Sequence, residues 1–178
     1  YQKMAPFSDY IAINISSPNT PGLRSLQGSD YLDSLLSAMQ EEQAKYFKPL
    51  YLKISPDLSL KELENIFELC LKYSIQGIIA TNTTIDHSFL SGGVSGHLLY
   101  SKAQIIREQL LKMNQNKLEI IGVGGFSTIE EIFSYWAQGG TIIQIYSSFV
   151  YKGPMFLKEI KESIDLKLKE TGLNSLAE

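Results

Sequence analysis

Short apolar, β-branched runs alternate with amphipathic helical patterns along almost all of this 178-residue chain. The runs cover residues 10–15, 50–54, 77–80, 119–123 and 141–146, lengths typical of buried strands. Between and after them, apolar residues recur every three or four positions, as in helices that cover a sheet. This strict alternation predicts a parallel β-sheet covered by helices, an α/β fold.

Capping-box spacings mark three expected helix starts. In this motif a hydroxyl, and a carboxylate or amide three residues later, satisfy free backbone amides reciprocally. No linker interrupts the pattern, so we expect one domain over residues 1–178. The capping pairs are Ser59 with Glu62, Ser101 with Gln104 and Ser127 with Glu130; Gly139 and Gly172 follow helical runs, and two more helices are expected at 30–46 and 154–171.

Two architectures fit this alternation. The five strand–helix units could complete a doubly wound open sheet, or they could be five of the eight units of a (β/α)8 TIM barrel, which typically needs about 250 residues. Periodicity does not choose between them. Both folds place their chemistry at the carboxyl ends of the strands, so the loops that follow the strands carry the functional information.

Charge and composition exclude several classes of function. The net charge of −3 and the scattered lysines give no electrostatic case for nucleic acid. The single cysteine, Cys70, excludes an internal disulfide, and its apolar neighbours at helical spacing predict that it packs in the core. His87 and His97 lack metal-ligand spacing, so we expect both at the surface and no metal site. No apolar run approaches the roughly 18 residues of a membrane span, so we expect this part of the protein to be soluble.

The loop after the first strand, residues 14–28, is long and rich in Ser, Asn and Pro. Such residues form ordinary turns in many proteins. This run, however, resembles almost residue for residue the active-site loop of class 2 dihydroorotate dehydrogenases. The resemblance implies that Ser17, the serine before the proline, is the catalytic base. Class 1 members have a cysteine there, so Ser17 indicates class 2.

The remaining strand ends resemble the same family in order and spacing, so the resemblance covers essentially the whole chain. It implies a TIM barrel of which this chain supplies about the last five units, the fourth to the eighth. The first three strands and their part of the site are then outside this sequence. The segments that carry the resemblance are 53–58, 81–84, 92–96, 122–125 and 144–147.

Gly124 and Gly125 follow a strand and precede a helix start, so backbone amides and the positive helix end can bind a phosphate there. A glycine pair alone is a weak signal. Together with Tyr146 and Ser147 at the next strand end, it matches the last two loops of a barrel, where phosphate sites are frequent. The resemblance implies that this is the phosphate site of flavin mononucleotide (FMN), approached by Gly96 from the preceding loop.

Lys53 ends an otherwise apolar strand, where an unpaired ammonium would cost several kcal/mol to bury. It needs an anionic partner, unless its stem alone is buried and its head reaches solvent. The resemblance implies that Lys53 faces the N1 and C2 carbonyl edge of the flavin.

Asn14, Asn19, Asn82 and Thr83 offer amides and a hydroxyl near the ends of two strands. Such groups suit a planar substrate with ring N–H, carbonyl and carboxylate groups, although asparagines in loops usually form turns. The resemblance implies that they bind dihydroorotate and orotate. It also implies that Asn14 and Thr81 lie near the flavin.

The activity implied by the resemblance is oxidation of dihydroorotate to orotate in pyrimidine biosynthesis, with FMN as cofactor and a quinone as electron acceptor. The complete enzyme is expected to lie on the inner membrane, which it would contact only through an N-terminal extension absent from this sequence. Two alternatives stay open: an FMN dehydrogenase of class 1 type, and a truncated, non-catalytic half-barrel. With three strands missing, we expect this segment alone to hold FMN weakly.

Overall fold

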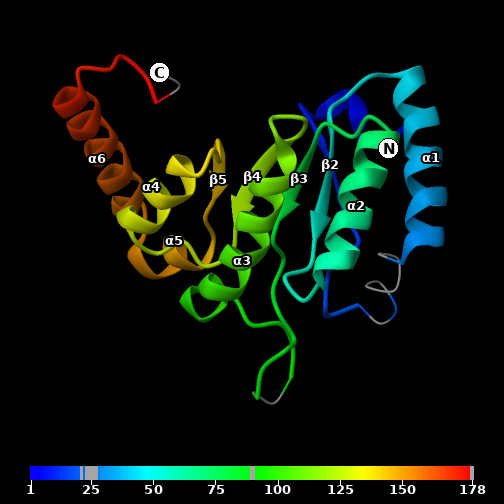
Figure 1. The fold of residues 1–178 in the computed structure, drawn as a ribbon, viewed down its shortest axis with the longest axis horizontal. Helices are drawn as coiled ribbons and strands as arrows, with labels where there is room; N and C mark the ends of the chain where they lie inside the picture. Colours follow the sequence, from blue (N-terminus) through cyan, green and yellow to red (C-terminus); the bar gives the residue numbers. More distant parts are fainter. Residues whose placement is uncertain (21, 23–27, 89–90, 177–178) are drawn as a thin grey trace.

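The strands lie side by side in the order in which the chain visits them. The computed structural model describes residues 1–20, 22, 28–88 and 91–176. Its sheet has the order β1-β2-β3-β4-β5, and every neighbouring pair is parallel. A doubly wound sheet instead reverses its strand order near the middle. Sequential parallel order is the arrangement of consecutive units of a (β/α)8 barrel, here a part of one (Figure 1).

The elements follow one another as expected of repeated strand–helix units. In chain order they are η1 (Ala5–Phe7), β1 (Ile11–Asn14), α1 (Ser29–Lys45), β2 (Leu50–Ile54), α2 (Leu60–Lys72), β3 (Gly77–Ala80), α3 (His97–Asn114), β4 (Glu119–Val123), α4 (Ile129–Ala137), β5 (Ile142–Gln144), α5 (Ser147–Lys152) and α6 (Met155–Thr171).

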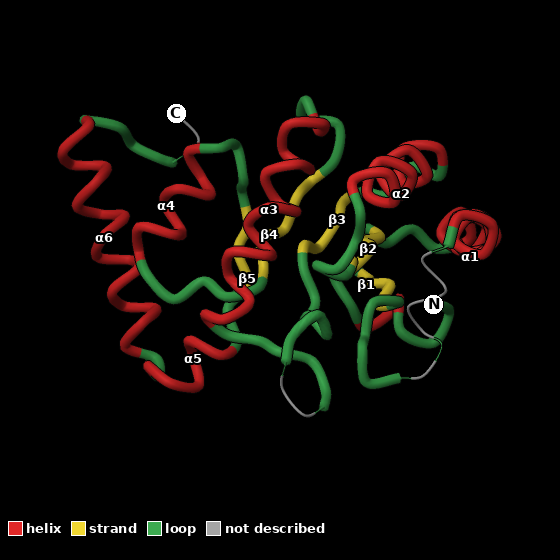
Figure 2. The backbone as a smooth tube through the Cα atoms, turned by 60° about the horizontal axis from the view of Figure 1, so that its bottom comes forward, coloured by secondary structure: helices red, strands yellow, loops and turns green. Residues whose placement is uncertain are grey.

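One face of the sheet packs against the helices, which follow the outer side of the curved row of strands (Figure 2). Leu50, Leu52 and Ile54 alternate along β2 and are fully buried against this layer. Leu63 and Ile66 of α2 belong to the same cluster. Because each such side chain contributes about 1.5–3 kcal/mol when buried, this layer holds the strands to the helices.

The opposite face of the sheet carries a row of residues that lie next to one another in the strand register. Asn14 pairs with Lys53, Lys53 with Ile79, Ile79 with Ile121, and Ile121 with Ile142. Ile79 and Ile121 are buried, whereas Ile142 on the outermost strand is 42% exposed. In a closed barrel this face is the interior, so the polar members of the row, Asn14 and Lys53, lie on the inner side.

Helix α2 begins and packs as its sequence predicts. The Ser59 hydroxyl accepts from the Glu62 backbone N–H (3.4 Å), and the Glu62 carboxylate accepts from the Ser59 N–H (2.8 Å), so the capping box is complete. Cys70 is fully buried on the inner face of the helix, which confirms its role in the core. Burial raises the pKa of its thiol to about 12.

Two predicted capping boxes are wrong. Helix α3 begins at His97 after Gly96, whose positive φ of 69° turns the chain into the helix, so Ser101 lies inside it. Before α4 the box is shifted by one residue: Thr128 accepts from the Glu131 N–H (3.2 Å), and the Glu131 carboxylate accepts from the Thr128 N–H (3.0 Å).

Most predicted boundaries are confirmed. The strands at 50–54, 77–80 and 119–123 match, and the helices predicted at 30–46 and 154–171 are each displaced by about one residue. Strand β5 is shorter than predicted, because the chain leaves the sheet after Gln144 and forms the short helix α5, which the sequence did not suggest. Among the described helices, none is both long enough and apolar enough to cross a membrane.

Candidate functional site

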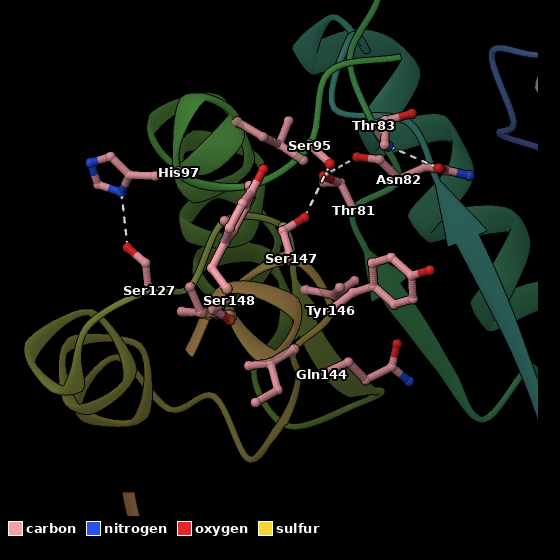
Figure 3. Close-up of a pocket in the computed structure, with 18 of the residues that line it drawn as sticks. Thr81, Asn82, Thr83, Ser95, His97, Ser127, Gln144, Tyr146, Ser147 and Ser148 are labelled. Atoms are coloured by element: carbon pink, nitrogen blue, oxygen red, sulfur yellow. Dashed lines mark hydrogen bonds between the residues drawn. The ribbon is translucent and has the colours of Figure 1, made fainter. Parts of the chain in front are cut away.

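A cavity of about 360 Å³ lies at the carboxyl ends of β2 to β5 (Figure 3). Parallel strands end at the same edge of the sheet, so residues distant in sequence meet there. The candidate residues that line it are Lys53, Thr81, Asn82, Thr83, Gly96, Gly124, Gly125, Tyr146 and Ser147. The structure therefore gathers most of the residues expected to bind a cofactor around one space.

Gly124 and Gly125 allow the loop after β4 to lie directly against α3. Both have positive φ angles, 105° and 86°. A Cβ at Gly125 would lie 2.5 Å from Tyr100 Cα, and one at Gly124 would lie 3.0 Å from Ala103 Cβ. Only glycine fits this backbone, which forms a thin layer between α3 and the cavity.

The loop that carries Gly96 meets the start of α5 at the cavity. The Ser95 and Ser147 hydroxyl oxygens are 3.1 Å apart. A dashed line in Figure 3 marks this hydrogen bond. A Cβ at Gly96 would lie 3.4 Å from Ser147 Cβ, so the two segments approach closely. Sequence reasoning missed Ser95, although its position next to Gly96 was a signal.

Lys53 enters the cavity from the end of β2 and is half-buried. Burial lowers the pKa of its ammonium below the ordinary value of 10.5. Among the ion pairs and side-chain hydrogen bonds recorded for the described residues, none involves this ammonium. A partly dehydrated cation in this setting suits an anionic or electron-rich ligand.

The ends of the first three strands are joined by polar side chains. The Asn82 amide donates to Asn14 Oδ1 (3.2 Å) and to Ser16 Oγ (3.1 Å). The Ser16 hydroxyl is fully buried and donates to the Lys53 carbonyl (2.6 Å). Sequence reasoning missed Ser16, whose only signal was its place beside Ser17. This network fixes Asn82 and Lys53 relative to each other.

Asn14, Ser17 and Asn19 lie beside the cavity and do not line it. Ser17 is half-buried, and its hydroxyl accepts from the Asn19 N–H (3.3 Å). The next residue, Pro18, lies 2.7 Å from the position of a Cβ on Gly93, and the cavity-lining Thr83 is also in contact range of that position. Residues 21 and 23–27 of the same loop lie outside the described part of the chain.

The loop between Thr84 and Gly96 is anchored at its base. Thr84 and Val94 form an antiparallel bridge, and Lys102 Nζ lies 2.8 Å from Asp57 Oδ1 and 2.6 Å from Asp86 Oδ2. These contacts connect the loop to α3 and to the loop after β2. These contacts therefore hold in place the loop whose residues Gly93 and Gly96 approach Pro18 and Ser147.

The two histidines differ in their surroundings. His97 is at the surface, as predicted, with its Nδ1 3.0 Å from Ser127 Oγ at the mouth of the cavity (Figure 3). His87 is half-buried, and its Nε2 lies 2.8 Å from the Gly92 carbonyl oxygen. The prediction of an exposed side chain therefore holds fully only for His97.

Comparison with known sequences identifies the family. A family model described as dihydroorotate dehydrogenase matches residues 1–168. A protein of Shewanella sp. (strain W3-18-1) named dihydroorotate dehydrogenase (quinone) is 44% identical over 179 residues, which cover 93% of this chain and 53% of that protein. One of the same name from Cronobacter sakazakii is 46% identical over 173 residues, covering 89% and 52%. The chain thus spans about half the length of these relatives.

Solved structures agree. A crystal structure of DHODH from Eimeria tenella in complex with ferulenol superposes with a TM-score of 0.88 at 29% identity, covering 99% of this chain and 55% of that one. The ligand-free form gives a TM-score of 0.86 at 30% identity, covering 97% and 55%. With a family model that matches nearly the whole sequence and a fold shared with solved members, the chain belongs to the dihydroorotate dehydrogenase family.

Proposed function

We propose that this protein is the part of a quinone-dependent dihydroorotate dehydrogenase that holds FMN and oxidises dihydroorotate to orotate in pyrimidine biosynthesis. One observation carries the proposal: a single cavity joins a glycine cradle, a partly dehydrated lysine and an asparagine–threonine pair. The quinone is proposed as electron acceptor because the relatives at 44–46% identity bear that name.

The donors around the cavity fit FMN. The backbone at Gly124 and Gly125 and the hydroxyl of Ser147 suit its phosphate, and Lys53 suits the electron-rich N1 and C2 edge of the ring. The volume of about 360 Å³ is within the range of cofactor and ligand sites. When bound, FMN supplies the acceptor for the hydride that leaves C6 of the substrate.

The chain's own side chains orient the substrate and move its proton. Asn82 and Thr83 line the cavity and can pair with ring N–H and carbonyl groups. Ser17 is proposed to remove the C5 proton from the loop beside the cavity. A serine hydroxyl is a weak base, so the proton must pass onward, through the Thr20 hydroxyl or through water.

The proposal predicts that Ser17→Ala slows oxidation of the substrate. Positioned general bases contribute about 10²- to 10⁴-fold in rate, so reduction of bound FMN by dihydroorotate should slow by about that factor. The measurement is anaerobic stopped-flow loss of the oxidised-flavin absorbance in purified protein saturated with FMN.

The control variant is Ser134→Ala, an exposed serine of α4, which should reduce at the wild-type rate. Reoxidation of reduced flavin by a quinone should be unchanged in Ser17→Ala. If wild-type protein saturated with FMN is not reduced by dihydroorotate, the proposed activity is wrong and the non-catalytic alternative holds. If Ser17→Ala reduces as fast as wild type, Ser17 is not the base.

A further inference from the structure

Arg107 is a charged side chain buried behind the proposed phosphate site. It lies on the inner face of α3 and is 2% exposed. Its guanidinium lies 4.3 Å from the ring centre of Phe126 and 5.4 Å from that of Tyr100. Its Nη1 donates to the carbonyls of Val123 (2.9 Å) and Gly124 (3.0 Å). These two carbonyls belong to the last residue of β4 and to the first residue of the loop that forms the glycine cradle.

Burying this cation is costly for the folded state. Burial lowers the pKa of Arg107 to about 10, so the side chain stays charged at neutral pH. None of the ion pairs recorded for the described residues includes it. Contacts with the aromatic rings offset part of the cost of removing the cation from water, but an apolar residue would fill the space without that cost.

The planarity of the peptide bond links Arg107 to the cavity. In a trans peptide the C=O and N–H groups point in opposite directions. Arg107 holds the carbonyls of two consecutive trans peptides, Val123–Gly124 and Gly124–Gly125. The N–H groups of Gly124 and Gly125 therefore point away from Arg107. Both glycines line the cavity and Arg107 does not, so these N–H groups point to the cavity side of the loop.

We propose that Arg107 is a positioning residue that directs the Gly124 and Gly125 amides toward the phosphate of the bound flavin and thereby sets the preference for FMN over riboflavin. The inference rests on the proposed function, because it takes FMN as the ligand. The buried positive charge also favours binding of the phosphate, because a charge one backbone layer away from it is poorly screened by water. No substrate or cofactor atom needs to touch Arg107.

The experiment compares FMN with riboflavin, which lacks only the phosphate. In Arg107→Gln we expect the affinity for FMN to fall about tenfold or more, the size expected when hydrogen bonds to a charged group are misaligned. The affinity for riboflavin should change less than about twofold. Both affinities are measured by titrating the 178-residue chain with FMN or with riboflavin and monitoring its amide NMR signals, which also detect weak binding. A residue that only supports the fold would lower both affinities together.

Two further variants make the test decisive. Lys112→Gln removes one positive charge from an exposed position of the same helix and should leave the FMN-to-riboflavin ratio unchanged. Arg107→Lys keeps the charge but lacks the flat guanidinium that lies against the Phe126 ring, so its ammonium is not fixed beside the two carbonyls and the ratio should fall several-fold. It serves as the deciding variant if Arg107→Gln does not fold. Titration with inorganic phosphate should shift the Gly124 and Gly125 amide signals in wild type and shift them less in Arg107→Lys.

The possible outcomes distinguish a failure of this inference from a failure of the proposed function on which it rests. If wild type does not prefer FMN to riboflavin, the proposed cofactor is wrong and the inference falls with it. If wild type prefers FMN and a folded Arg107 variant keeps the full preference, the proposed function stands and the role of Arg107 is overturned. A reduced ratio with intact riboflavin binding supports both.

Discussion

Lys53 shows at the residue scale how a residue proposed to bind a ligand can oppose stability. Its strand neighbours Leu52 and Ile54 are fully buried and contribute to the core. Lys53 faces the other side of the sheet, where burial disfavours its charged form and lowers its pKa. Without a ligand, the folded chain therefore contains a cation that would be better hydrated in the unfolded chain.

Lys53→Met should make the ligand-free chain more stable at pH 7, because methionine keeps most of the stem and removes the charge. The unfolded chain keeps the lysine proton up to about pH 10.5, whereas the folded chain releases it at lower pH. Stability of the wild type therefore rises with pH through that interval, and the advantage of the variant shrinks there. Urea unfolding of both proteins at pH 7 and near pH 10 measures this difference.

The proposed function also predicts that the same variant binds FMN more weakly than wild type, since the cation proposed to face the ring edge is gone. Lys61→Met, at an exposed position of α2, is the control and should change neither property. A Lys53→Met protein that is less stable than wild type at pH 7 would mean that the ammonium is well hydrated or paired in the folded state.

At the scale of elements, the helix starts show where a sequence pattern suffices and where it does not. A hydroxyl followed three residues later by a carboxylate or amide occurs at both Ser59 and Ser101. Only Ser59 precedes a helix, because the chain before Ser101 already enters α3 at His97. The spacing therefore shows only that a capping box can form. The box forms where the preceding residues are not already part of the helix.

Ser59→Ala should therefore destabilise the chain by about 1 kcal/mol through loss of the cap. Ser101→Ala should be neutral or slightly stabilising, since alanine is the better residue inside an exposed stretch of helix. Urea midpoints of the two variants, measured side by side, test the pair. Equal losses of stability would contradict the position of the α3 start.

At the scale of the whole molecule, the sequence predicted the repeated units better than the geometry of the site. Apolar runs located β2, β3 and β4 correctly, because short runs rich in apolar and β-branched residues are typical of strands; of the three, only β3 is buried at every position. The pattern could not say whether the strands are sequential or doubly wound. The resemblance to a family, and then the strand order itself, decided that question.

The positions of site residues on loops depend on packing between distant segments, which no local sequence pattern reveals. Gly124, Gly125 and Lys53 meet at one cavity because strand ends converge, which the fold class implies. Ser17 was expected in the site but lies beside the cavity and does not line it, and the next residue, Pro18, lies close to residue 93. Arg107 went unnoticed, although a lone charge on the apolar side of a helical pattern was a visible signal.

Cys70 lies in the centre of the layer between the sheet and α2, and its burial has a chemical consequence. Thiols react as thiolates, and here both the raised pKa of about 12 and the lack of access prevent reaction. We expect a thiol reagent at pH 7 to react at least about 10³-fold more slowly with the folded chain than with the urea-unfolded chain. Labelling at the unfolded rate would contradict the buried position of the sulfur.

A ligand that binds only the folded chain must slow this reaction further, by a factor that grows with its concentration relative to Kd. FMN and riboflavin should then differ in how strongly they protect the same sulfur atom. The alkylation rate of one atom, far from any proposed ligand contact, thus reports how often the core opens and which flavin keeps it closed.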